Sequence, residues 1–245
     1  MAKHNVWMSV SDLMTGLMVI FLFIAVAYMS KVDENQTVLK DFVETKHQLH
    51  DKLVNEFKGD TAKWKMSIDG DLSMKFNNPS VLFAQGSYQL TDEFKQILDE
   101  FLPKYFNILL NDSLRSHIQE IRIEGHTDDL AAYSFDPDPY ISNIILSQQR
   151  SLSVMRYFLA SDTYHSYNPQ QQALLRYWFT VNGLSYGKPL DSDGNLINPI
   201  ENPKAEMDRD KSRRVEFRIV TTDKDVLENF VNKNLSKDDG KEDSK

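Results

Sequence analysis

The chain has 245 residues, no cysteine and a formal net charge of -8. The lack of cysteine excludes disulfides and thiolate metal sites, and the acidic balance, without any Arg and Lys cluster among aromatic residues, argues against nucleic-acid binding. The length suffices for one ordinary domain and a connector behind an N-terminal segment.

The first predicted element is an apolar run over residues 10–29, in which Asp12 is the only charged residue. A helix of that length covers roughly 30 Å, the thickness of a bilayer's hydrocarbon core. We therefore predict a transmembrane helix over residues 10–30, after a short segment over residues 1–9. A cleaved signal peptide is the alternative, but only Lys3 precedes the run as a positive charge, and the run is longer than a usual signal core.

Asp12 is the first candidate functional residue. A carboxylate at the centre of a bilayer costs about 2.5 to 3.5 kcal/mol or more, so proteins keep one where it lines a water path, pairs with another group or carries an ion. The charges that flank the run, Lys3 before it and Lys31, Asp33 and Glu34 after it, leave the orientation open.

A helical linker or stalk is predicted over residues 31–60, because residues 31–58 contain neither proline nor glycine. Its apolar residues follow an alternating a and d pattern that Asn35, Lys46 and Glu56 interrupt. The pattern fits a short paired coiled coil and equally a single amphipathic helix on the membrane or on the following domain. The apolar positions are Val32, Leu39, Phe42, Leu49 and Leu53.

Strand and helix patterns alternate over residues 61–222, which we assign to one α/β domain. Alternating apolar residues on both sides of a D-G-D sequence at residues 69–71 predict a β-hairpin. Thr91, followed by two acidic residues, predicts the N-cap of a helix that continues to a loop at residues 111–116. The hairpin positions are Trp64, Met66 and Ile68, then Leu72, Met74 and Phe76.

The pattern continues with a strand that ends at Gly125, a polar loop over residues 127–140 and a helix over about residues 142–160. The core candidates of this helix are Ile145, Leu152, Met155, Tyr157 and Phe158. The later predicted elements are a helix over residues 170–176 and strands over residues 178–181 and 214–220. Residues 223–245 are predicted to hold a helix end and a disordered tail, because the last residues are rich in Lys and Asp and almost lack apolar side chains.

A polar cluster follows the strand that ends at Gly125. His126, Asp128 and Asp129 could be imagined as a metal site, but their close spacing and the lack of a clear further ligand argue against it. The sequence has neither a G-x-S-x-G nucleophile motif nor a phosphate-binding loop. We therefore expect no enzyme, no metal and no cofactor.

Five ordered motifs over about residues 64–222 resemble OmpA-like peptidoglycan-binding domains. The motifs are Phe83-x-x-Gly86-Ser87, Ile123-x-Gly125-His126-Thr127-Asp128, Leu146-Ser147-x-x-Arg150-Ser151, Gly183-x-x-x-Gly187-x-Pro189 and Ser212-Arg213-Arg214-Val215-Glu216. The resemblance implies an α/β sandwich with a mixed sheet behind the transmembrane helix and the stalk. It also implies a ligand, the diaminopimelate of the peptidoglycan stem peptide.

In that family an aspartate and an arginine hold the free carboxylate and amine of diaminopimelate, which here correspond to Asp128 and Arg150. Asn143 and Leu146 on the same helix and Arg213 near the last strand are implied as helpers. The chemistry suits a zwitterion, which needs one fixed anion and one fixed cation. Read without the motifs, Arg150 is a surface helix charge and Asp128 a turn residue.

Two features depart from the family's pattern. The loop between Asp128 and Leu146 is longer than in the simplest members, and Ser212 stands where an asparagine is usual. Both concern the rim of the binding site and leave the domain assignment intact.

The segment Ser11-Asp12-Leu13-Met14-Thr15-Gly16-Leu17-Met18 resembles the transmembrane helix of flagellar stator B subunits (MotB and its relatives), and most of all the Zorya anti-phage branch of these motors. The resemblance implies that Asp12 is the ion carrier. Ser9, Ser11 and Thr15 are candidate polar residues of the pore, Thr15 sharing the helical face of Asp12, although small polar residues equally pack helices together.

The same resemblance implies an inner-membrane protein with a cytoplasmic N-terminus and a periplasmic domain. Its expected partners are a second copy of this chain and a ring of multi-helix, MotA-like A subunits. We expect this ring to contain five A subunits. The carried ion, H⁺ or Na⁺, stays open, although a proton channel is the function we adopt. A flagellar or gliding stator and a passive envelope tether are the alternatives.

Overall fold

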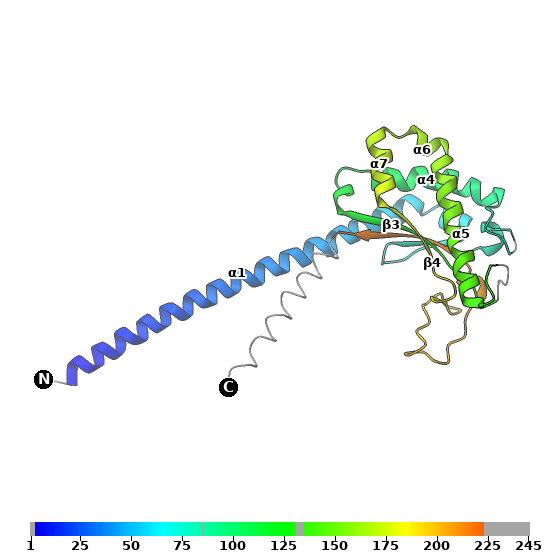
Figure 1. Ribbon diagram of the computed structural model, residues 1–245. Coiled ribbons are helices and arrows are strands. Elements are labelled where there is room, and N and C mark those ends of the chain that lie inside the picture. Colours follow the sequence, from blue (N-terminus) through cyan, green and yellow to red (C-terminus); the bar gives the residue numbers. More distant parts are fainter. Residues whose placement is uncertain (1–2, 85, 131–134, 223–245) are drawn as a thin grey trace. The chain divides into compact units, whose positions relative to one another are not determined.

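The computed structural model describes residues 3–84, 86–130 and 135–222, without the side chains of residues 3–9, 32–39, 41 and 42 (Figure 1). The chain divides into two compact units, Met1–Thr45 and Lys46–Lys245. The predicted tail after residue 222 lies outside the described residues.

The first unit is formed by α1 (Lys3–Phe57), whose last turns belong to the second unit. Within α1, the 22 residues Val10–Lys31 have a mean hydropathy of 2.3, and their side chains are not buried against any of the residues that the structure describes. The segment is long and apolar enough to cross a membrane. This agrees with the predicted N-terminal apolar helix.

The second unit contains a five-stranded sheet in the order β1-β2-β5-β3-β4. β3 and β4 are parallel and the other neighbours are antiparallel, so the sheet is mixed, as predicted. The strands are β1 (Met66–Ile68), β2 (Ser73–Phe76), β3 (Ile118–Gly125), β4 (Phe179–Gly183) and β5 (Val215–Thr221).

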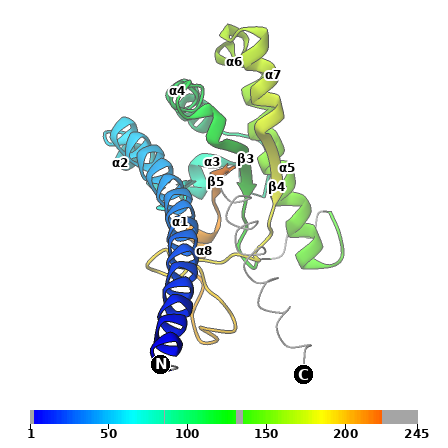
Figure 2. The same cartoon turned by 90° about the vertical axis from the view of Figure 1, so that its left-hand side faces the viewer.

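Of the helices, α5 runs along β3 and β4 (Figure 2). Thr91 accepts a hydrogen bond from the backbone N–H of Phe94, which confirms the predicted N-cap of α4. The remaining helices are α2 (Thr61–Trp64), α3 (Pro79–Leu82), α4 (Asp92–Leu109), the 3-10 helix η1 (Arg115–His117), α5 (Pro139–Ala160), α6 (Asp162–Ser166), α7 (Pro169–Trp178) and α8 (Arg209–Ser212).

An aromatic cluster forms the core between α4 and the sheet. The ring of Phe101 lies 5.1 Å from that of Phe76 on β2, 5.0 Å from that of Phe217 on β5 and 5.2 Å from that of Phe57 at the end of α1. Such packing anchors the last turns of α1 to the domain.

Leu49 and Leu53 belong to this core rather than to a stalk. Both are buried, as is Phe57, and the three residues follow one another at spacings of four along one face of α1. For the last turns of the predicted linker over residues 31–60, the structure agrees with the alternative of a helix that packs on the following domain. The side chains of Val32, Leu39 and Phe42 lie outside the described residues.

The core face of α5 differs from the prediction. Of the five candidates only Phe158 is fully buried, and the buried face also holds Leu146, Val154 and three serines. Small residues are required where α5 meets β3, because even a Cβ on Gly125 of β3 would lie only 2.3 Å from the carbonyl oxygen of Ser147 on α5. The helix and the strand thus approach at a distance that large residues would prevent.

Several predicted boundaries shift. α5 begins at Pro139, earlier than predicted, because Asp138 caps it by accepting the N–H groups of Tyr140 and Ile141. Trp64 and Trp178 end helices α2 and α7 instead of belonging to strands. The hairpin itself is confirmed, with Met66 opposite Phe76.

Candidate functional site

The candidate ligand site begins where β3 ends at Gly125. The N–H of His126 donates to the carbonyl of Arg214 at 3.0 Å, and the N–H of Thr127 donates to the carbonyl of Ser185 at 2.9 Å. These bonds fix the G-H-T-D turn between the segments that precede β5 and follow β4. Asp128 is thereby placed at the carboxyl end of β3.

α5 is fixed to the same end of the sheet. Ser151 donates from its hydroxyl to the carbonyl of Asn182 at 3.0 Å, and Gln148 donates from its side-chain amide to the carbonyl of Val181 at 3.1 Å. Arg150 lies between these two contacts, so its position along the sheet is set by its neighbours.

Asp128 is buried and has two partners. Its Oδ1 accepts the N–H of Leu130 at 3.1 Å, and its Oδ2 accepts a hydrogen bond from Nη1 of Arg213 at 2.8 Å. The first contact is that of a turn-forming aspartate. The second provides a charge-assisted pair, which Arg213 shares with Asp210.

Arg150 is not an ordinary surface charge. Its Nε donates to the carbonyl of Ser87 at 3.0 Å, and its guanidinium lies 5.0 Å from the ring centre of Phe83. Burial and the nearby Arg213 lower the pKa of Arg150 to about 10, against an opposing effect of Asp128. The group remains a cation at neutral pH.

Three guanidinium groups border one small pocket beside Asp128. Arg150, Arg213 and Arg214 line it together with His126, and its volume is about 20 Å³, enough for roughly one water molecule. Both ring nitrogens of His126 are buried without a hydrogen-bond partner among the described residues. The arginines around this pocket are chemically suited to the negative end of a ligand, and the neighbouring carboxylate of Asp128 is suited to a positive end.

Asn143 and Leu146 contribute differently from Asp128. The side-chain amide of Asn143 donates to the carbonyl of Leu130 at 3.0 Å, so it supports the turn after Asp128. Leu146 is buried against the domain. In the structure Asn143 thus supports the turn and Leu146 packs in the interior, and their part in binding stays a prediction.

A second ion pair closes the same turn from α8, and it could not be foreseen from a motif. Arg209 donates from Nε and Nη2 to the two carboxylate oxygens of Asp129, at 2.7 and 3.1 Å.

Ser212, the residue that departs from the family's pattern, is buried, and its hydroxyl oxygen accepts a hydrogen bond from the backbone N–H of Leu190 at 2.9 Å. The serine thus ties α8 to the start of the long loop before it.

Glu124, His126 and Glu216 lie close enough together to hold a metal ion by distance alone. Arg214 lies 2.6 Å from Glu216, and Arg218 lies 2.9 Å from Glu216 and 3.2 Å from Glu124. Cations already balance the two carboxylates, which disfavours a further positive ion. We interpret the group as a structural charge network.

His126 is held neutral in this network. Burial lowers the pKa of His126 well below its usual range, and the nearby cations Arg214, Arg218, Lys75 and Lys188 lower it further. Burial has the opposite effect on Glu124, whose pKa it raises.

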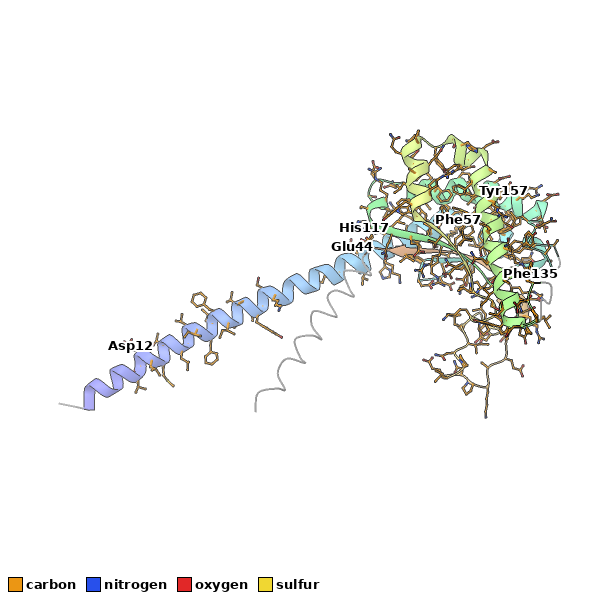
Figure 3. All side chains as sticks on the ribbon, viewed as in Figure 1. Asp12, Glu44, Phe57, His117, Phe135 and Tyr157 are labelled. Carbon is orange, nitrogen blue, oxygen red and sulfur yellow. The ribbon has the colours of Figure 1, made fainter. Side chains whose placement is uncertain are left out.

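The predicted ion-carrying residue, Asp12, lies in the first unit, within the apolar part of α1 (Figure 3). Thr15 is exposed and donates from its hydroxyl to the carbonyl of Ser11 at 2.8 Å. Thr15 therefore keeps its own hydroxyl satisfied within the helix, which is common for polar residues in membrane spans. The side chain of Ser9 lies outside the described residues.

Comparison with known proteins gives a consistent set of relatives. Residues 82–195 match the OmpA family. The chain is 35% identical over 221 residues, 88% of its length and 87% of the relative's, to the Zorya protein ZorB of Escherichia coli strain Crooks. It is 26% identical over 223 residues, covering 89% and 81%, to a Zorya protein ZorB of Escherichia coli O139:H28.

Solved structures are similar as well. A protein described as MotB-like from Desulfovibrio vulgaris has 22% identity and a TM-score of 0.49, with 74% of this chain and 98% of that one covered. The periplasmic domain of Helicobacter pylori MotB has 19% identity and a TM-score of 0.39, with 66% and 85% covered.

Proposed function

The chain belongs to the ZorB family, and we propose that it is the peptidoglycan-anchored B subunit of an ion-driven, stator-type motor in anti-phage defence. As a member of this family it is a motor component and not an enzyme. The transmembrane helix would place it in the bacterial inner membrane as a single-pass protein, with a cytoplasmic N-terminus and a periplasmic domain.

One observation carries this proposal. The same chain has a carboxylate, Asp12, inside a 22-residue apolar span and, in a separate folded unit, an OmpA-like domain with a carboxylate beside guanidinium groups. An ion carrier can do mechanical work only if part of the motor is fixed. The second unit supplies chemistry suited to that fixation.

For wall binding, we assign the ammonium of diaminopimelate to Asp128 and its carboxylate to Arg150, with Arg213 beside both. Arg213 already holds Oδ2 of Asp128. A ligand ammonium must therefore share or replace this partner, and the released guanidinium can then meet the ligand carboxylate. The exchange keeps every charge paired, which avoids the cost of an unpaired buried ion.

For the membrane part, we assign Asp12 as the ion carrier and Ser9, Ser11 and Thr15 as its polar neighbours. Within the described residues, no other part of the chain covers the apolar side chains of the span. We propose that they are covered by lipid, by a second copy of the chain and by a ring of five MotA-like A subunits. A pore position for Asp12 avoids the cost of an ionised carboxylate in lipid.

The decisive test is Asp12→Asn in the complete motor, with Asp12→Glu as the matched control that keeps an ionisable group. We expect Asp12→Asn to abolish phage protection while the membrane level of the protein and its binding to sacculi stay unchanged. Protection retained by Asp12→Asn would show that the chain works as a passive tether. Partial protection by Asp12→Glu supports the carrier role.

A further inference from the structure

A wide groove of about 640 Å³ lies on the domain, between the end of α1, the second half of α4 and the α6–α7 segment. Its volume falls within the range of about 300 to 1,000 Å³ typical of ligand sites. None of its lining residues belongs to the Asp128 site. The groove is therefore a surface separate from the Asp128 site.

Neutral amides and hydroxyls dominate the walls of the groove. Within the described chain, the amide of Asn107 and the hydroxyls of Thr163 and Tyr167 have no hydrogen-bond partner. Ser166 uses its hydroxyl only as a donor, to the carbonyl of Thr163, so its lone pairs remain available. The groove thus offers several donors and acceptors without net charge.

The charged residues of the groove do not favour an ionic ligand. Lys104 is paired with Asp60 at 2.6 Å, and the other lining charge is the acidic Glu56. A phosphate or a nucleic acid would need free cations, which the groove lacks among its described residues.

The apolar part of the groove is a small platform of three side chains. Pro103, Leu110 and the ring of Tyr167 are partly buried. Tyr167 packs against Phe106 at 6.3 Å between ring centres, which holds its ring in place.

We infer that this groove binds the glycan strand of the cell wall, through its acetamido and hydroxyl groups. Neutral amide and hydroxyl side chains around an apolar platform match a polar, uncharged sugar. The inference rests on the proposed wall-anchoring function and adds a second contact to it. Two weak contacts with one polymer strengthen attachment because the second is formed at a high effective concentration.

The test is titration calorimetry of the full chain in detergent with a tetramer of β-1,4-linked N-acetylglucosamine. The variant Asn107→Ala, Thr163→Val removes two unpartnered polar groups without adding bulk. Gln170→Ala is the matched control, because Gln170 is exposed on α7 and does not line the groove. We expect the double variant to bind the tetramer at least about tenfold more weakly and the control to match the unmodified chain.

Binding of a soluble diaminopimelate-containing tripeptide, measured in parallel, separates this inference from the proposed anchor. Asp128→Ala should lose the tripeptide and keep the tetramer. The inference is wrong if the unmodified chain does not bind the tetramer, or if Asp128→Ala loses it. It is equally wrong if the double variant changes the oligomeric state in light scattering while its tetramer affinity is unchanged, because the groove is then a contact between copies.

Discussion

Arg213 and Asp128 form a direct ion pair, with 2.8 Å between Nη1 and Oδ2, across the turn that follows β3. The pair joins the segment before β5 to the end of β3, although the two residues are far apart in the sequence. Asp128 is buried while Arg213 is about one-third exposed, at 33% for its side chain. A ligand can thus approach the pair from the arginine side.

Asp128→Asn should weaken binding to purified sacculi by about tenfold or more, because the amide cannot pair with an ammonium group. The turn should survive, since the asparagine oxygen can still accept the N–H of Leu130. Asp129→Asn is the matched control, one residue away and paired outside the pocket with Arg209. Equal retention of Asp128→Asn and the unmodified chain in a pull-down would contradict the assigned site.

Arg150→Lys should also weaken sacculus binding by about tenfold, although the charge is kept. A lysine cannot reproduce both the Nε contact with the carbonyl of Ser87 and the planar stacking on Phe83. Arg156→Lys, an exposed arginine on the same helix, serves as the control. The same pull-down measures both variants. Normal binding by Arg150→Lys would contradict a role of the planar guanidinium in ligand binding.

Leu53→Ala should lower the free energy of unfolding of the domain by about 2 to 5 kcal/mol, because it opens a cavity in the core. Val54→Ala, on the next position of α1, is 37% exposed and should cost much less. Denaturant unfolding followed by tryptophan fluorescence gives both values. Equal effects of the two substitutions would mean that the end of α1 belongs to the stalk after all.

Acidification should destabilise the domain through His126. Its folded-state pKa lies well below its usual value near 6.5, so the unfolded chain binds the proton more tightly. The stability from this residue is fully present above about pH 6.5 and is lost as the pH falls toward the folded pKa, by at most about 1.4 kcal/mol per pH unit.

His126→Gln should flatten the dependence of unfolding free energy on pH between about pH 5 and 6.5. Glu124 works in the opposite direction, because its raised pKa favours the folded state as the pH falls, so the slope of the unmodified chain is a net value. Chemical denaturation at several pH values measures both slopes. Identical slopes for the variant and the unmodified chain would show that His126 does not titrate in this range.

Local sequence chemistry determined most of the secondary structure. The apolar run, the D-G-D turn, the cap at Thr91 and the alternation before Gly125 each specify an element through contacts a few residues long, and the structure has these elements. The ordered motifs also predicted the OmpA-like domain, which the family match confirms. The roles of Asp12, Asp128 and Arg150 stay predictions.

Only the tertiary structure decided which partners these residues have. Periodicity alone could not tell that Leu49 and Leu53 face the domain instead of a second helix, since both environments are apolar. The pairing of Arg213 with Asp128 and of Arg209 with Asp129 joins residues that are distant in the chain. The sequence determines its elements through local backbone and capping forces, whereas the ligand site depends on long-range packing that brings β3, α5 and α8 together.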